Sequence, residues 1–181
     1  MVVDGQGDVH VGGGFTSAIV DFDPGPDVAE LTNAGSYDVF LLRFLDDGTL
    51  VSAQQFASDG HDNLWGLATD CDDDLVVAGH FNSVIDLDPG DGVAMHTSAG
   101  NADAFVVRLG GDGAYKWSQS WGGTDYDQIN AVVIGPGRRI DVAGRFTGTA
   151  DLEPGAGVTQ VVSKGQSDDF FAILRPSTGL W

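Results

Sequence analysis

The chain has 181 residues, of which 42% are hydrophobic and 9% aromatic, which is enough for a core in roughly one domain. It carries 27 acidic and 8 basic residues, and a net charge of −19 repels phosphate backbones and anionic lipids. Nucleic-acid and membrane-surface functions are therefore disfavoured. No run of about 18 apolar residues is present to span a membrane. The single cysteine, Cys71, excludes an intrachain disulfide and a cysteine-based zinc site.

The strongest pattern is a repeat of one short motif. Asp21-Phe22-Asp23-Pro24-Gly25 returns as Asp86-Leu87-Asp88-Pro89-Gly90 and as Asp151-Leu152-Glu153-Pro154-Gly155, with a spacing of 65 residues (21 to 86, and 86 to 151). A fixed period of this size indicates repeated supersecondary units that stack side by side. We expect one repeat domain over residues 1–181, with repeats at 1–58, 59–123 and 124–181.

Each repeat opens with a pattern typical of a β-hairpin. Two short apolar runs flank a polar turn within residues 2–15, and the same arrangement recurs at 67–81 and 132–146. The turn of the second copy is rich in aspartate, at 70–74, but the third copy has Gly-Pro-Gly-Arg-Arg at 135–139. We therefore expect this turn to require polarity rather than carboxylates.

The repeated motif follows the hairpin. Pro followed by Gly suits the two central positions of a type II turn, because proline presets φ and glycine accepts a positive φ. The residues beyond the turn, at 28–32, 93–97 and 158–162, are expected to pair back as an outer hairpin.

The most apolar strand of each copy comes next, at 38–44, 103–109 and 168–174. Both alternating faces of these segments are largely apolar, which predicts burial on both sides. An Asp47-Gly48 or Asp112-Gly113 turn then predicts a second hairpin, and the segments 49–56 and 114–121 complete the unit.

Four strands in up-and-down order, with no helical periodicity, predict an all-β fold built from β-propeller blades. About three four-stranded antiparallel repeats are present, whereas closed propellers use roughly four to eight blades. We therefore expect an incomplete propeller, with two apolar blade faces uncovered. Either the chain is a fragment of a longer repeat array, or chains associate as a homo-oligomer to close the ring.

The residues of the third and second copies resemble the bacterial β-propeller repeat family known as SBBP repeats. The similarity lies in Trp121-Gly122-Gly123-Thr124-Asp125-Tyr126-Asp127, Val142-Ala143-Gly144-Arg145-Phe146 and the strand at 103–109 with its Asp112-Gly113 turn. The Asp-Phe-Asp-Pro-Gly variant is similar to a subgroup with a longer connection after the second strand. The resemblance covers the whole chain and implies a scaffold or surface role in exported proteins, not a defined reaction.

The paired acids of the motif have two interpretations, which concern Asp21 and Asp23, Asp86 and Asp88, and Asp151 and Glu153. The favoured one is that the second acid caps its Pro-Gly turn by accepting hydrogen bonds from turn amides. The alternative is a calcium site, because carboxylates and turn carbonyls are the oxygen ligands that Ca²⁺ prefers. The retained charge of Glu153, a poor turn-capping residue, favours the calcium interpretation.

Other recurrent acids are expected to have structural roles. Asp38, Asp103 and Asp168 precede the core strands and are expected to accept backbone hydrogen bonds, with metal ligation as the lesser alternative. Asp62 and Asp127 are expected to anchor the loops between blades.

The four histidines, at 10, 61, 80 and 96, are not expected to assemble, because they occupy non-equivalent positions of the repeat. Trp65, Trp117, Trp121 and Tyr126 suit either a sugar-stacking surface or packing between blades.

These observations predict a non-enzymatic, exported or cell-surface scaffold for display, adhesion or protein–protein interaction. The extracellular assignment places the export signal outside this stretch. The alternative is a carbohydrate-binding propeller, or a propeller-face hydrolase or lyase, with its site in the loops around His61-Asp62 and Tyr126-Asp127. Calcium is the one candidate cofactor, and the partner is a protein or a glycan.

Overall fold

The computed structural model describes all 181 residues and contains 17 β-strands and one short 3-10 turn, η1 (Pro136–Arg138). The predicted all-β fold is therefore confirmed. No helix is present that has the length and apolar character needed to cross a membrane.

Each repeat folds into its own antiparallel sheet, and we call the three sheets with their connections units 1, 2 and 3. Unit 1 has the strand order β1-β2-β5-β6, unit 2 the order β7-β8-β11-β12, and unit 3 the order β13-β14-β17. The strands of unit 1 are β1 (Val2–Val3), β2 (Val9–Phe15), β5 (Asp38–Phe44) and β6 (Leu50–Phe56). Those of unit 2 are β7 (Asn63–Thr69), β8 (Leu75–Phe81), β11 (Asp103–Leu109) and β12 (Tyr115–Gly123). Those of unit 3 are β13 (Gln128–Ile134), β14 (Ile140–Phe146) and β17 (Asp168–Leu174).

An outer hairpin projects from each unit after its second strand, as predicted. The pairs are β3 (Ile19–Asp21) with β4 (Glu30–Thr32), β9 (Val84–Asp86) with β10 (Met95–Thr97), and β15 (Thr149–Asp151) with β16 (Gln160–Val162). The third hairpin also pairs with the neighbouring unit, because Gly122 and Gly123 of β12 lie opposite Asp151 and Ala150 of β15.

The turn prediction was right for Asp-Gly and wrong for Pro-Gly. Gly48 and Gly113 have φ values of 87° and 83°, and a tight Asp-Gly hairpin turn requires such a positive φ at its glycine. By contrast, Gly25, Gly90 and Gly155 are not among the glycines with positive φ, so their turns are not type II. Side-chain capping by the preceding acids organises these corners, as described below.

Two hydrophobic cores lie between the units. One joins Val39 and Leu41 of β5 to the face of unit 2 formed by Leu75, Val77 and Phe105. The other joins the opposite face of unit 2 to Ile140, Val142 and Leu174 of unit 3, with Val76, Ala78 and Val106 among its members. Alternate residues of β8 and β11 thus enter different cores, which follows from the two-residue side-chain period of a strand.

The predicted burial of the central strands on both faces is confirmed for β11, where all seven residues are buried. It was wrong for β17, where Phe171 is 64% and Ile173 43% exposed. The reason is positional: no further sheet lies against the outer face of unit 3.

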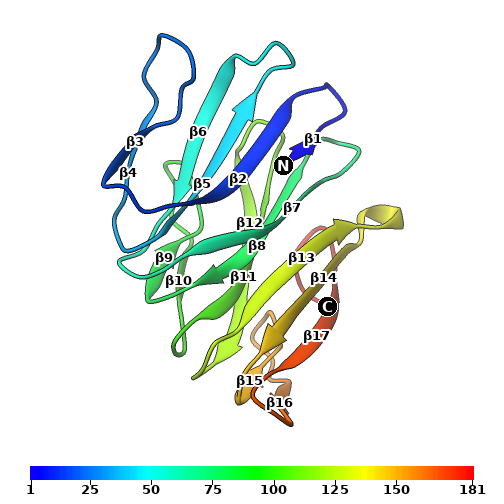
Figure 1. Cartoon of the computed structure of the whole chain (residues 1–181). Helices are drawn as coiled ribbons and strands as arrows, with labels where there is room; N and C mark the ends of the chain where they lie inside the picture. The colour runs from blue at the N-terminus through cyan, green and yellow to red at the C-terminus, as the bar shows by residue number, and fades with distance from the viewer.

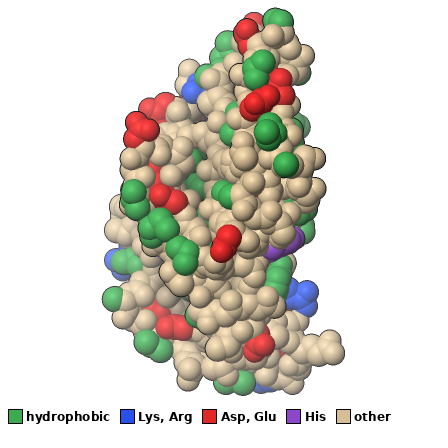
Figure 2. All heavy atoms as spheres, turned by 90° about the vertical axis from the view of Figure 1, so that its left-hand side faces the viewer, with side chains coloured by type: hydrophobic (Ala, Val, Ile, Leu, Met, Phe, Trp, Pro, Cys, Tyr) green, Lys and Arg blue, Asp and Glu red, His purple; other side chains and the backbone are tan.

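Figure 1 shows the sheets following one another in chain order, with unit 1 in blue to cyan, unit 2 in green, and unit 3 in yellow to red. They do not close into a barrel or ring within one chain. Figure 2 shows acidic side chains spread over one face of the molecule with few basic ones, as the net charge of −19 requires.

Candidate functional site: a histidine and aromatic cluster between units 2 and 3

Four aromatic side chains from separate segments meet where unit 2 adjoins unit 3. They are His61 from the loop before β7, Trp65 from β7, His80 from β8, and Tyr126 from the loop before β13. The ring of His80 lies at the centre, with centroids 5.5 Å from His61, 6.2 Å from Trp65 and 5.0 Å from Tyr126. We call these four residues the ring cluster.

A β-bulge presents Trp65 at this place. The register of β7 against β8 shifts between Leu64 and Gly66, so Trp65 is the extra residue. The same irregularity occurs in β13 between Ile129 and Ala131, where the extra residue is Asn130. Bulges redirect a side chain out of the alternating pattern of a strand. The repeat therefore provides one redirected side chain in each of these two units, an indole in one and an amide in the other.

The hydrogen bonds of the cluster fix the tautomer of His80. The indole N–H of Trp65 can only donate, and it lies 3.0 Å from Nδ1 of His80, which must accept. In a neutral imidazole the proton then resides on Nε2. That nitrogen lies 3.3 Å from Nδ1 of His61 and 3.0 Å from the hydroxyl of Tyr126. The chain of bonds holds the indole of Trp65 in one orientation.

Burial differs sharply within the cluster. His80 has no exposed surface, whereas Trp65 is 50% exposed and His61 is also exposed. Burial, and in second place the neighbouring His61, lowers the pKa of His80 to about 4. Burial also raises the pKa of the Tyr126 hydroxyl. At neutral pH His80 and Tyr126 are therefore uncharged, and they form hydrogen-bonding groups beside one exposed indole.

The expectation that the histidines do not assemble was wrong for His61 and His80. Their positions are not equivalent in the repeat, but non-equivalent positions of one unit meet when its lead-in loop folds back over the end of β8. The loops around His61 and Tyr126, expected as the site in the alternative function, do converge. The isolated bridge of Tyr37 with His61, repeated as Ala102 with Tyr126, brings both loops to the same level of their units.

The acids next to the cluster anchor the loops, as predicted. Asp62 accepts bonds from the Ser58 and Asn82 amides at 2.8 and 3.1 Å, and Asp127 accepts from the Gly123 and Thr147 amides at 2.6 and 3.0 Å. Burial raises the pKa of Asp62 to about 6.

The acids before the core strands accept backbone bonds in the same way. Their donors are the amides of Ala34, Ala99 and Lys164, which bond to Asp38, Asp103 and Asp168.

The acidic corners of the repeated motif are organised chiefly by the first acid. Oδ1 of Asp86 accepts hydrogen bonds from the amides of Asp88 at 3.0 Å and Ala94 at 2.8 Å. Asp21 and Asp151 bond in the same way to the amides two and eight residues onward. These bonds lower the pKa of Asp21, with the amide of Ala29 contributing most.

The second acid caps the Pro-Gly turn in two of the three copies. Asp23 and Asp88 accept from the amides of Gly25 and Gly90, while Glu153 accepts from the hydroxyl of Thr159. The structure nowhere brings three or more histidine, cysteine or acidic side chains into an arrangement that could hold a metal ion. Calcium binding at the corners remains a prediction.

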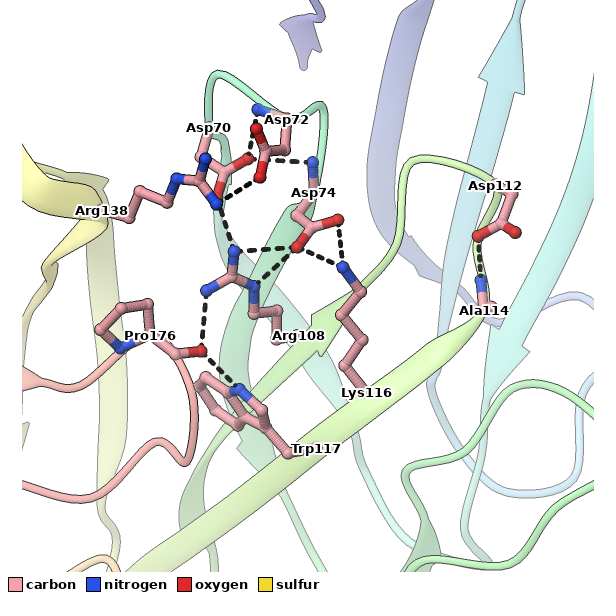
Figure 3. A network of polar contacts seen from close by, with 10 residues as sticks. All are labelled: Asp70, Asp72, Asp74, Arg108, Asp112, Ala114, Lys116, Trp117, Arg138 and Pro176. Carbon is pink, nitrogen blue, oxygen red and sulfur yellow. Dashed lines mark hydrogen bonds and ion pairs between the residues drawn. The ribbon is translucent and has the colours of Figure 1, made fainter.

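A separate polar network joins units 2 and 3 (Figure 3). Arg108 of β11 donates to Asp74 at 2.8 and 3.0 Å, to Asp70 at 2.6 Å, and to the carbonyl of Pro176 at 2.7 Å. Lys116 pairs with Asp74, and Arg138 of unit 3 pairs with Asp72. An open depression of about 390 Å³ adjoins the network, but the cations lining it are already paired with these carboxylates.

The expectation that the first turn of each unit requires polarity rather than carboxylates was wrong for units 1 and 2. Buried Asp70 and Asp74 match Arg108, and in unit 1 Asp8 matches Arg43 at 2.7 Å. In unit 3 the position of Arg108 is Ile173, and the position of Asp74 is Arg139, which pairs with Asp141. The carboxylates are therefore required wherever the core strand carries arginine.

His96 is held by two serines of β12, with Nδ1 2.8 Å from Ser120 and Nε2 2.8 Å from Ser118. Its equivalents in the other units are Leu31 and Val161, so the polar group and its partners replace an apolar contact.

Trp121 is 4% exposed and lies in the core, and Trp117 donates to the carbonyl of Pro176. Of the three tryptophans of unit 2, Trp65 is exposed, Trp117 is half-buried and Trp121 is buried.

Comparison with protein-family models matched no family, and comparison with curated proteins found no similar chain.

Proposed function

We propose that the chain is a run of β-propeller blades that forms a ring with further blades and serves as a non-enzymatic surface scaffold for display or adhesion. One observation carries the proposal: the same interface recurs between successive units and then stops. Ala78 and Val106 of unit 2 are fully buried against unit 3, while their equivalents in unit 3, Ala143 and Phe171, are exposed. Unit 3 thus presents a contact face without a partner.

The uncovered face of unit 3 carries exposed apolar side chains beside charged ones, because Asp141, Arg145 and Asp169 stand where unit 2 has the buried Val76, His80 and Ala104. Val133, Phe171 and Ile173 are exposed by 57%, 64% and 43% on this sheet. Large apolar side chains exposed together on one face of a sheet indicate an interaction surface. The outer edge of β17 is also unpaired, since the strand bonds only to β14. An unpaired edge is a template for a further strand.

The apolar face at the other end of the chain supports head-to-tail closure. Unit 1 repeats the sheet order of unit 2, so its outer face corresponds to the face of unit 2 that unit 1 covers. Two chains would supply six units, within the roughly four to eight blades of known propellers. Two-fold symmetry is also the commonest symmetry of oligomers.

Solution mass tests this proposal. We expect light scattering or sedimentation to give about twice the 18.9 kDa of one chain. Phe171→Asp, which puts a charge on the uncovered face, is expected to reduce the mass to that of one chain. Val93→Asp is the matched control, because Val93 is 75% exposed but lies in the outer hairpin of unit 2. A monomer at high concentration that binds no apolar dye would overturn closure by a second copy.

The non-enzymatic part of the proposal has its own test. His96 is the only imidazole of unit 2 within hydrogen-bond reach of a serine, through Ser118 and Ser120, and burial lowers the pKa of His96. His96 and Ser118 are tied into the core by Ser120 and Tyr115. We expect no hydrolase or lyase turnover above background. Turnover that disappears in Ser118→Ala would overturn this part.

A further inference from the structure

We infer that the ring cluster is a binding site for the apolar face of a neutral pyranose sugar, with Trp65 as the stacking platform. The inference rests on the proposed display or adhesion role, which it extends by naming the class of ligand. It does not depend on ring closure, because all the residues belong to one chain. Failure of the mass test and failure of the sugar test are therefore distinguishable.

The first argument is the state of the indole. Trp65 is 50% exposed, while the other ring nitrogen donor in this region, Trp121, is in the core. Its N–H is already bonded to His80, so the ring is fixed in orientation before any ligand arrives. Exposure of a large apolar ring is unfavourable unless something covers it, and fixing the ring beforehand removes part of the entropic cost of binding.

The second argument is the chemistry around the indole. None of the hydrogen bonds or ion pairs of the four rings involves a carboxylate, although the chain has 27 acidic residues. The adjacent carboxylates of Asp62 and Asp127 are fully buried and accept loop hydrogen bonds. The rings that surround Trp65 are therefore not paired with acids, which disfavours a cation, since a cation would call for carboxylates. Arg145 is the cation whose charge acts on the cluster, through Tyr126.

The third argument is the supply of hydrogen-bonding groups at the rim. Nδ1 of His61 faces His80, so Nε2 of His61 is available for a hydrogen bond to a ligand outside the cluster. A pyranose has one apolar C–H face and a rim of hydroxyls that both donate and accept, which matches an indole edged with imidazole.

The structure also indicates why the site is not a deep pocket. The cluster lies at an edge strand, β7, rather than under a covering loop. A stacking platform of this kind binds one sugar weakly, and repetition in an assembled array raises the avidity without new contacts. Such a site suits adhesion to a glycan surface.

Titration with methyl glycosides tests the inference. The probes are the methyl pyranosides of glucose, galactose, mannose and N-acetylglucosamine, with tetramethylammonium as a cationic contrast. The readout is saturation transfer to the sugar together with the shift of the Trp65 indole N–H signal. We expect at least one pyranoside to bind, and Trp65→Ala to weaken binding about tenfold or more. Trp65→Phe, which keeps a ring but loses the bond to His80, is expected to bind at an intermediate strength.

Trp181→Ala is the matched control, because Trp181 is 41% exposed but lies outside the cluster. It should bind as the wild type does, and a thermal melt of each variant establishes that it is folded. Three results would overturn the inference: no pyranoside bound at tens of millimolar, equal binding by folded Trp65→Ala, or preference for tetramethylammonium. His61→Ala separates stacking from hydrogen bonding, since it should weaken binding without abolishing it.

Discussion

Units 2 and 3 carry the same strand order on similar sequence, yet the two central strands differ in environment. β11 is buried along its whole length, whereas β17 alternates between half-buried and exposed residues and buries only Leu174. Residue type alone does not cause this difference: Asp169 replaces Ala104, but the exposed Phe171 and Ile173 stand where β11 has Val106 and Arg108. The neighbours cause it: unit 2 lies between two sheets and unit 3 has one. Burial in this fold is a property of position in the array.

Units 2 and 3 also differ in the charged residues that they bury. Unit 2 buries Asp70 and Asp74 with Arg108, while unit 3 replaces Arg108 with Ile173 and Asp74 with Arg139. A buried arginine without its acids, or the acids without the arginine, would leave an uncompensated charge. We therefore expect the arginine and its acids to be replaced together or not at all.

Breaking the network on one side should have the largest effect. We expect Arg108→Ile, which gives unit 2 the residue of unit 3, to lower the free energy of unfolding by about 3 to 5 kcal/mol, because Asp70 loses its only cation. Urea unfolding measures the change. Arg138→Ala, which removes the exposed pair with Asp72, is the control and should change stability little.

A second variant decides between charge and shape in that result. Arg108→Ile combined with Asp70→Asn and Asp74→Asn removes the buried charges together with the arginine. We expect the triple variant to be more stable than Arg108→Ile alone. If it is less stable, the arginine acts through packing and its bond to Pro176, and the charge-matching account of units 2 and 3 is wrong.

The boundary between the two units should respond to pH through His80. Its pKa of about 4 lies below the ordinary value of 6.5, so its stabilising contribution is present above pH 6.5 and is lost as the pH falls towards 4. Asp62 acts in the opposite sense, because its pKa is raised from 3.8 to about 6. Its contribution is present below pH 3.8 and is lost as the pH rises through 6. The two trends oppose each other between pH 4 and 6.

Replacing His80 should leave the pH dependence of stability due to Asp62 unopposed. We expect His80→Gln, whose amide oxygen can still accept from Trp65, to remove a pH-dependent contribution of about 3 kcal/mol across this window. The difference in unfolding free energy between wild type and variant, measured at several pH values from 4 to 7, cancels the background charge of the chain. A difference that is independent of pH would show that His80 is not buried in its neutral form.

A matched pair of truncations measures the effect of position directly. Val106 and Phe171 occupy equivalent places, with no exposure in unit 2 and 64% in unit 3. We expect Val106→Ala to cost about 2 kcal/mol, since it removes two buried methyl groups and leaves a cavity. Phe171→Ala, although it removes more atoms, should stay within about 0.5 kcal/mol in a monomer. Equal losses in dilute solution would mean that the outer face of unit 3 is already covered.

The regular part of the fold could be predicted from the sequence because the repeat supplies each signal three times. The three central strands have the predicted bounds, and the outer hairpins and the Asp-Gly turns are where they were expected. The acids before the central strands accept loop amides as predicted, because that requirement recurs in every unit. A residue type that recurs in every copy of the repeat indicates a structural requirement that all three units share.

The ring cluster could not be found by the same reasoning, because it is made of residues that differ between copies. His61, Trp65 and His80 correspond in unit 3 to Tyr126, Asn130 and Arg145. The pairing of Arg108 with Asp74 could have been found, since both positions change together in unit 3 and both acid and arginine are present in units 1 and 2. Joint departures from a repeat indicate contact, and here they indicate it across 34 residues.

The smallest expected effect concerns calcium at the acidic corners, where the units are most alike. Oδ1 of Asp86 already accepts two backbone amides, so only the other oxygens of Asp86 and Asp88 are open to a cation. A ligand that binds the folded state alone stabilises it by about 0.4 kcal/mol when its concentration equals its Kd, and by about 2.7 kcal/mol at a hundredfold excess. We expect millimolar calcium to raise the melting temperature slightly and EDTA to reverse the rise.

Asp86→Asn keeps an oxygen that can accept both amides and removes the charge, so it should reduce the rise in melting temperature that calcium causes and preserve most of the stability. Asp86→Ala removes the cap as well and should melt earlier with or without calcium. An equal calcium response in wild type and Asp86→Asn, or no response in the wild type, would leave Asp86 with the amide-capping role that its hydrogen bonds already describe.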